Sequence, residues 1–92
     1  IYFYAFIVAL FIFLGGGATA PDMIDTLWQA LKPGGRLVAH GVTLETEALL
    51  FAESAEHGGE LTRIGIARAG AVGSFRAFRP ALPVTQWSVV KP

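Results

Sequence analysis

The feature that most constrains the fold is an uninterrupted apolar run, Ile1–Leu14, that ends in three glycines, Gly15–Gly17. The run is too short to span a bilayer, which takes about 20 apolar residues. Strands of a parallel sheet covered on both faces are apolar throughout, and such a strand needs only Leu10–Leu14. The run therefore predicts a buried strand, with a membrane or interfacial helix as the alternative.

The residues before Leu10 exceed what this strand needs, and no basic segment precedes them, which argues against a signal peptide. We treat residues 1–9 as of doubtful origin and assign them no function. Apolar residues make up 53% of the sequence and charged residues only 15%, well below the usual quarter. This composition fits a piece of a larger sheet-centred domain, so residues 1–92 are expected to form part of one domain.

The residues after the glycines predict a helix followed by a strand. Thr19–Asp22 matches a capping box with Pro21 in the first turn. The helix is expected to end at Lys32, before Pro33-Gly34-Gly35, and a strand to cover residues 36–40. The helix carries an apolar face with helical spacing, formed by Ile24, Leu27, Trp28 and Leu31.

A second helix is predicted from its own start and stop signals. Thr43 is the expected N-cap, Glu45 and Glu47 are solvated acids of the first turn, and Gly58-Gly59 ends the helix. Strands are expected over residues 60–68 and 85–91, with a loop over residues 69–83. The expected buried face of this helix consists of Leu44, Ala48, Phe51, Ala52 and Ala55.

This order of elements predicts an α/β fold. Alternating strands and helices imply a parallel sheet with right-handed crossovers. The last two strands have no helix between them, so we expect them to pair as an antiparallel hairpin at the sheet edge.

The octapeptide "LKPGGRLV" and the layout around it resemble the second half of class I methyltransferases that use S-adenosylmethionine. The longer segments "GGGATAPDMIDTLWQALKPGGRLVAHGVTLETEALL" and "RIGIARAGAVGSFRAFRPALPVTQWSVVKP" resemble the C-terminal methyltransferase domain of the precorrin-6Y C5,15-methyltransferases (decarboxylating). The resemblance covers residues 10–92. It implies a partial Rossmann-like sheet containing the family's fourth to seventh strands, two crossover helices and a terminal antiparallel hairpin.

The same resemblance implies a function in cobalamin biosynthesis. The parent enzyme would methylate C15 of a precorrin and promote loss of the carboxylate from its C12 acetate. The family's glycine-rich loop after the first strand lies upstream of Ile1, so the fragment alone is expected to bind the cofactor poorly and to be inactive. Two alternatives are a class I methyltransferase fragment with another small-molecule acceptor and an inactive membrane-attached fragment.

Ligands of open α/β sheets bind beyond the carboxyl ends of the strands, where Gly15, Gly16 and Gly17 are expected to lie. Glycines let a ligand approach the backbone closely, and the resemblance implies contact with the methionine part of S-adenosylmethionine. The alternative is a tight turn that requires positive φ. His40, at the end of the next strand, is a candidate acid or base, or a histidine hydrogen-bonded in a loop. Thr43 is a candidate substrate contact as well as a helix cap.

Basic residues dominate the end of the chain, although the net charge is zero. All seven acids lie within residues 22–60, and five of the seven basic residues lie within residues 63–91. Arg68, Arg76 and Arg79 flank the expected loop, and guanidinium groups pair well with carboxylates such as those of a tetrapyrrole. A solvated loop or a subunit interface is the alternative.

Several partners are not expected. No nucleic-acid-binding motif is present, and membrane association is not favoured. Two distant histidines, scattered acids and the absence of cysteine predict no metal site. His57 is expected at the surface. Relatives of this kind form homo-oligomers, so the resemblance implies one for the parent protein, and a cytoplasmic location is the default.

Overall fold

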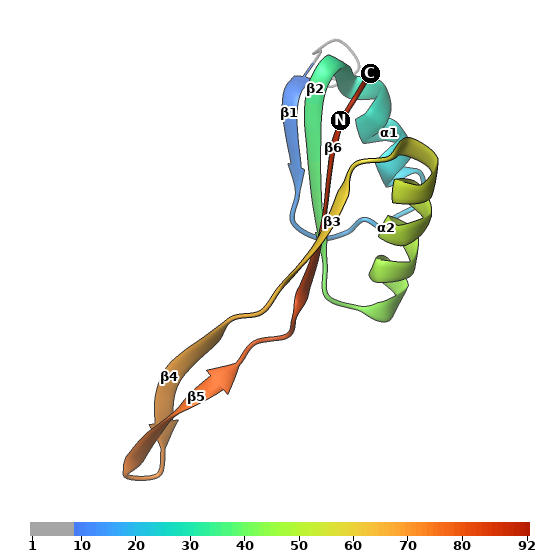
Figure 1. Ribbon diagram of the computed structural model, residues 1–92. Coiled ribbons are helices and arrows are strands. Elements are labelled where there is room, and N and C mark those ends of the chain that lie inside the picture. The colour runs from blue at the N-terminus through green and yellow to red at the C-terminus, as the bar shows by residue number, and fades with distance from the viewer. Residues whose placement is uncertain (1–8) are drawn as a thin grey trace.

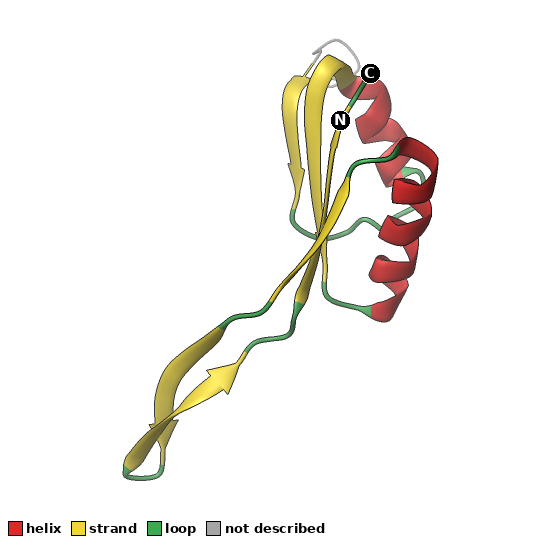
Figure 2. Cartoon of the chain, in the orientation of Figure 1, coloured by secondary structure: helices red, strands yellow, loops and turns green. Residues whose placement is uncertain are grey.

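The computed structural model describes residues 9–92, so the expectations for residues 1–8 of the apolar run lie outside the described residues. Figure 1 shows a sheet with two helices on one face and a hairpin that extends away from it, and Figure 2 shows how the loops join these parts. In chain order the elements are β1 (Ala9–Leu14), α1 (Met23–Ala30), β2 (Leu31–Gly41), α2 (Leu44–His57), β3 (Glu60–Ile64), β4 (Ala67–Val72), β5 (Phe75–Pro80) and β6 (Val84–Val90).

The four-stranded sheet has the order β1-β2-β6-β3. Strands β1 and β2 are parallel, and β6 is antiparallel to both β2 and β3. The predicted parallel pair and the terminal antiparallel pair at the sheet edge are therefore confirmed. The last strand in the sequence lies inside the sheet, and β1 and β3 form its two edges. The prediction that residues 10–14 form a buried strand is wrong in its burial, because Leu10, Phe11 and Phe13 are each more than half exposed.

The core lies between the sheet and the two helices. Inward-facing residues of β2 and β6 alternate with outward-facing ones, as the two-residue period of a strand requires. Burial of large apolar side chains stabilises the fold by about 1.5–3 kcal/mol each. The buried apolar residues are Ala18, Ile24, Leu31, Leu37, Ala39, Leu50, Trp87 and Val89.

The predicted capping box at the start of α1 is wrong, because two successive turns occupy that segment. Ala20 N donates to Gly17 O at 3.0 Å, and Met23 N donates to Ala20 O at 3.1 Å. The N-cap is Asp22, whose backbone is left-handed (φ 59°) and whose side chain makes no capping hydrogen bond. Pro21 therefore precedes the helix.

The helix also ends two residues earlier than predicted. Leu31 is already extended and its side chain is buried, so it belongs to β2. The backbone of the Pro33-Gly34-Gly35 segment is paired with the end of the chain. Gly34 N donates to Lys91 O at 2.7 Å, and Lys91 N donates to Gly35 O at 2.8 Å.

For α2, the predicted ends are confirmed but the predicted buried face is wrong. The side chain of Thr43 accepts a hydrogen bond from Thr46 N, and Gly58 (φ 79°) follows the last helical residue. Leu50 is fully buried, whereas Leu44 is 79% exposed and Phe51 is 44% exposed. All five residues of the predicted stripe are exposed, and the helix packs on the sheet through the roughly opposite side.

The sequence predicts one strand over residues 60–68 and a loop over residues 69–83. In the structure β3 ends at Ile64, and β4 and β5 form a separate antiparallel hairpin. Their register pairs Ala67 with Pro80 and Val72 with Phe75. The turn between them contains Gly73 with φ 61°, a conformation that favours glycine and suits a two-residue hairpin turn. Both strands are exposed along almost their whole length.

Candidate functional site

The glycine turn, His40 and Thr43 lie at the same edge of the sheet, as predicted. Strands β1 and β2 are parallel, so their carboxyl ends meet there, and Leu14 pairs with Ala39 in the register. Gly15 therefore follows β1 at the level of His40. Thr43 comes two residues after β2, at the start of α2.

The three positions Gly15, Gly16 and Gly17 differ in whether the structure requires a glycine there. Gly17 has φ 76°, so the backbone needs glycine at this position. A Cβ added at Gly16 would meet no atom within 4 Å, and one at Gly15 would meet only the ring of Phe13, at 3.2 Å. The turn requirement thus explains Gly17, while Gly16 leaves open space beside the backbone.

His40 points to the face of the sheet that carries no helix. Its Nε2 donates to Oε1 of Gln86 at 2.8 Å, and its ring packs edge-to-face against Phe13 with centroids 4.9 Å apart. Because the Gln86 carbonyl oxygen can only accept, Nε2 carries a hydrogen, and in the neutral imidazole the lone pair is then on Nδ1. Gln86 was missed in the sequence, because its role depends on the pairing of β2 with β6.

Thr43 uses its hydroxyl within α2. Its Oγ1 accepts from Thr46 N at 3.1 Å and donates to Thr46 Oγ1 at 2.9 Å. These bonds satisfy the cap and leave one lone pair for any ligand. The structure therefore gives direct support to the capping role, and the substrate contact stays a prediction.

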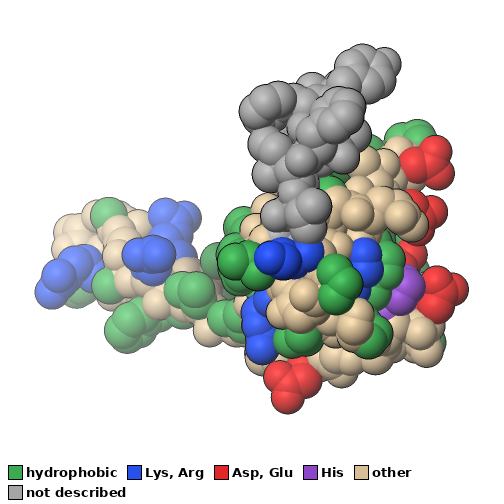
Figure 3. Space-filling model, turned by 90° about the horizontal axis from the view of Figure 1, so that it is seen from above, with side chains coloured by type: hydrophobic (Ala, Val, Ile, Leu, Met, Phe, Trp, Pro, Cys, Tyr) green, Lys and Arg blue, Asp and Glu red, His purple; other side chains and the backbone are tan. Residues whose placement is uncertain are grey.

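The three arginines of the hairpin divide between its two faces. Arg68 and Arg79 are direct partners in the register and lie on one face. Arg76 pairs with Ala71 and, with Phe78, lies on the other face. The hairpin extends past the edge where β1 and β2 end (Figure 1), and its basic side chains stand apart from the acids in Figure 3.

Among residues 9–92, no helix combines the length and the apolar character that a membrane span needs.

Residues 9–91 match the family described as precorrin methyltransferase domain. The chain is 50% identical over 80 residues to the precorrin-6Y C(5,15)-methyltransferase (decarboxylating) of Sinorhizobium sp, which covers 87% of the chain and 19% of that protein. The chain therefore spans about a fifth of this curated relative.

Two solved structures share the fold. The targeted domain of a precorrin-6Y C5,15-methyltransferase from Corynebacterium diphtheriae is 47% identical with a TM-score of 0.85, covering 90% of this chain and 49% of that one. The C-terminal domain of the Rhodobacter capsulatus precorrin-6Y C5,15-methyltransferase is 43% identical with a TM-score of 0.79, covering 91% and 45%. These similarities confirm the predicted fold class, a partial Rossmann-like sheet of class I methyltransferases.

Proposed function

The chain belongs to the precorrin methyltransferase domain family, and from this membership we propose that it is the C-terminal half of a methyltransferase domain acting in cobalamin biosynthesis. The proposed parent enzyme methylates C15 of a precorrin and promotes loss of the C12 acetate carboxylate. The names of its relatives support this acceptor over another small molecule and over a membrane-attached fragment. The main structural support for the proposal is the parallel register of β1 and β2, which brings the glycine turn level with His40.

The cofactor is proposed to lie against Gly15, Gly16 and Gly17. S-adenosylmethionine, when bound, supplies an activated methyl group. The open space beside Gly16 supports a close approach of the ligand to the backbone at this point. Methyl transfer by in-line displacement depends mainly on the positioning of donor and acceptor. Rigid attachment of the turn to β1 is therefore the contribution expected from this half of the domain.

His40 is proposed to accept a proton or a hydrogen bond from the acceptor through Nδ1. Its hydrogen bond to Gln86 and its contact with Phe13 fix the ring, which supports a defined direction for that lone pair. Histidine is the side chain that most often acts as a general acid or base in enzymes.

Arg68, Arg76 and Arg79 are proposed to bind the carboxylate groups of the tetrapyrrole, with Thr43 as a further contact. Like charges that face each other directly across two strands destabilise a hairpin. Arg68 and Arg79 are in this position, so an anion between them would remove the repulsion. We also propose that the parent protein is a homo-oligomer and that it lies in the cytoplasm.

Gly16→Ala tests the cofactor site in the full-length protein. The added methyl group has open space and an unstrained backbone, so the fold should be unaffected. We expect the affinity for S-adenosylmethionine, measured by calorimetry, to fall about tenfold or more, equivalent to roughly 1.4 kcal/mol. The cause is loss of close contact between the ligand and the backbone.

Gly65→Ala is the matched control, because a Cβ at Gly65 also meets no atom within 4 Å and its φ is not positive. It should leave cofactor affinity unchanged. Equal affinities of the Gly16→Ala variant and the unmodified protein would show that the cofactor does not use this turn. Methylation of a precorrin, compared with other acceptors, tests the substrate separately.

A further inference from the structure

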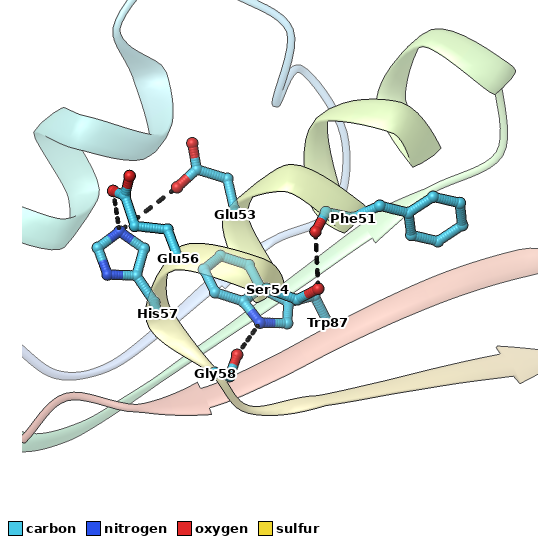
Figure 4. Close-up of polar contacts among 7 residues, drawn as sticks. All are labelled: Phe51, Glu53, Ser54, Glu56, His57, Gly58 and Trp87. Atoms are coloured by element: carbon cyan, nitrogen blue, oxygen red, sulfur yellow. Dashed lines mark hydrogen bonds and ion pairs between the residues drawn. The ribbon is translucent and has the colours of Figure 1, made fainter.

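A cluster of potential metal ligands lies in the last turns of α2. Nε2 of His57 is 3.5 Å from Oε1 of Glu53 and 3.3 Å from Oε2 of Glu56. Figure 4 shows both carboxylates directed at the same nitrogen of His57. One donor atom from each residue lies within 4.8 Å of the other two. Because α2 starts at the candidate cofactor edge and runs back for 14 residues, about 21 Å, the cluster is at the opposite end of the helix layer.

Contacts from three elements hold the ring of His57. It stacks on Trp28 of α1 with centroids 4.1 Å apart and an interplanar angle of 29°. Trp87 of β6 lies on its other side at 6.3 Å and donates through Nε1 to Gly58 O at 2.9 Å. These aromatic contacts fix the plane of the imidazole ring and thereby the direction of Nε2. The side chain of His57 is 19% exposed, so it is not the surface residue expected from the sequence.

Nε2 of His57 faces carboxylate oxygens of two residues, Glu53 and Glu56. A neutral imidazole with its Nε2 lone pair toward two carboxylate oxygens would be repelled, so this nitrogen must carry a proton or bind a cation. Oε1 of Glu53 is shielded from solvent and has no hydrogen-bond partner. An ion would satisfy this oxygen, which the ion-pair contact with His57 alone leaves without a donor.

Other charged groups around the cluster increase its need for a cation. Burial raises the pKa of Glu53, His57 opposes this rise, and repulsion from Asp25 of α1 and from Glu56 adds to it. Lys91 at the end of β6 does not neutralise these acids. Its Nζ donates to the backbone oxygens of Trp28 and Leu31, both at 2.8 Å.

We propose that Glu53, Glu56 and His57 bind a divalent transition-metal ion, with Zn²⁺ as the expected occupant. Around tetrahedral Zn²⁺ with bonds of 2.0–2.1 Å, ligand atoms lie about 3.3 Å apart, close to the two distances observed at His57. An imidazole with two carboxylates favours such an ion over Mg²⁺ or Ca²⁺.

Both the approach to this site and its remaining coordination positions are available. Glu56 is 73% exposed, so its side chain can rotate to bring its oxygen closer to that of Glu53. An open pocket of about 210 Å³ lies against Glu53 and is lined also by Asp25 and Leu49, so water can reach this side of the cluster. The bound ion would connect α2 with α1 and β6 through the His57 ring, independently of the proposed methyl transfer.

The test uses the full-length protein, stripped of metal, and Co²⁺ as a spectroscopic probe that Zn²⁺ displaces. We expect visible d–d absorption on addition of Co²⁺ and its loss on addition of Zn²⁺. His57→Gln, Glu53→Gln and Glu56→Gln should each reduce the affinity for Co²⁺ at least about tenfold. Glu45→Gln, in the first turn of the same helix, is the matched control and should bind Co²⁺ as the unmodified protein does.

If His57→Gln or Glu53→Gln lowers the stability of the protein, Glu56→Gln is the decisive variant. The side chain of Glu56 is exposed, so its substitution leaves the core undisturbed. Circular dichroism verifies that each variant is folded. Equal affinities of the Glu56→Gln variant and the unmodified protein for Co²⁺ would overturn the proposal, as would absence of binding. The cluster would then be an ion pair with a proton on His57. None of these measurements depends on methyltransferase activity.

Discussion

At the scale of the residue, Thr85 shows how one buried hydroxyl joins α2 to the sheet. Among the residues that the structure describes, it is the only buried polar side chain, and its Oγ1 donates to Oε2 of Glu47 at 2.9 Å. Glu47 also forms an ion pair with Arg63 at 3.4 Å and is only 14% exposed. Glu47 is therefore held against the sheet, whereas its position in the first turn predicted a solvated acid.

Thr85→Val should destabilise the protein by about 2 kcal/mol. The substitution keeps the shape of the side chain but removes a hydrogen bond to a charged carboxylate, and such bonds contribute about 1.5–3 kcal/mol. Urea denaturation followed by tryptophan fluorescence measures the loss. Thr62→Val, at an exposed position of β3, is the control and should change stability by less than about 0.5 kcal/mol. Similar losses in the two variants would contradict a stabilising role for the Thr85–Glu47 bond.

At the scale of the element, the orientation of α2 can be tested with two leucines of the same helix. Leu50→Ala should cost about 2–5 kcal/mol, because Leu50 is fully buried and its removal leaves a cavity. Leu44→Ala removes the same atoms from a side chain that is 79% exposed, and should cost less than about 0.5 kcal/mol. Thermal unfolding of both variants makes the comparison. A larger loss for Leu44→Ala would mean that the sequence-predicted face is the buried one.

The elements predicted correctly are those whose signals are local. The glycines after β1, Thr43 at the start of α2 and Gly58 at its end each act on neighbouring residues. The buried face of α2 could not be predicted in this way, because apolar residues occur on two opposite sides of the helix. The choice between the stripes depends on contacts with strands distant in the sequence.

The same limit applies to the candidate site. The common edge of the glycine turn and His40 follows from parallel strands, so it could be predicted. The division of the arginines between two faces needed the register of β4 and β5, and the segment had been predicted as a loop. The two-residue Gly73-Ser74 turn was the local signal for this hairpin. The stacking of His57 on Trp28 joins two helices and has no local signal.

At the scale of the whole molecule, charge is separated along an elongated shape of 55 × 28 × 24 Å. Acids lie mainly along the helix side and arginines on the hairpin (Figure 3). A basic projection of this kind attracts an anionic acceptor at long range, and salt screens that attraction.

Arg68→Gln combined with Arg79→Gln in the full-length enzyme should raise KM for the precorrin about tenfold without changing kcat. The loss of two exposed ion pairs, each contributing roughly 0.7 kcal/mol to substrate binding, accounts for this rise in KM. The KM of the unmodified enzyme should also rise with ionic strength, and that of the double variant should rise less steeply. Arg76→Gln, on the opposite face of the hairpin, removes only one of the proposed carboxylate contacts and should raise KM less than the double substitution in the same steady-state assays. A KM that responds to neither the double substitution nor salt would argue against carboxylate binding by this pair.

The place of β6 between β2 and β3 also governs when the protein can assemble during its synthesis. A nascent polypeptide that has emerged only as far as β5 contains both helices, but β2 and β3 have no strand to join them. The hydrogen bonds that join β2 and β3 through β6 can therefore form only after Val84–Val90 leaves the ribosome. A messenger truncated ahead of this segment would yield a product in which β2 and β3 both lack their partner strand, and unpaired edges of this kind promote aggregation.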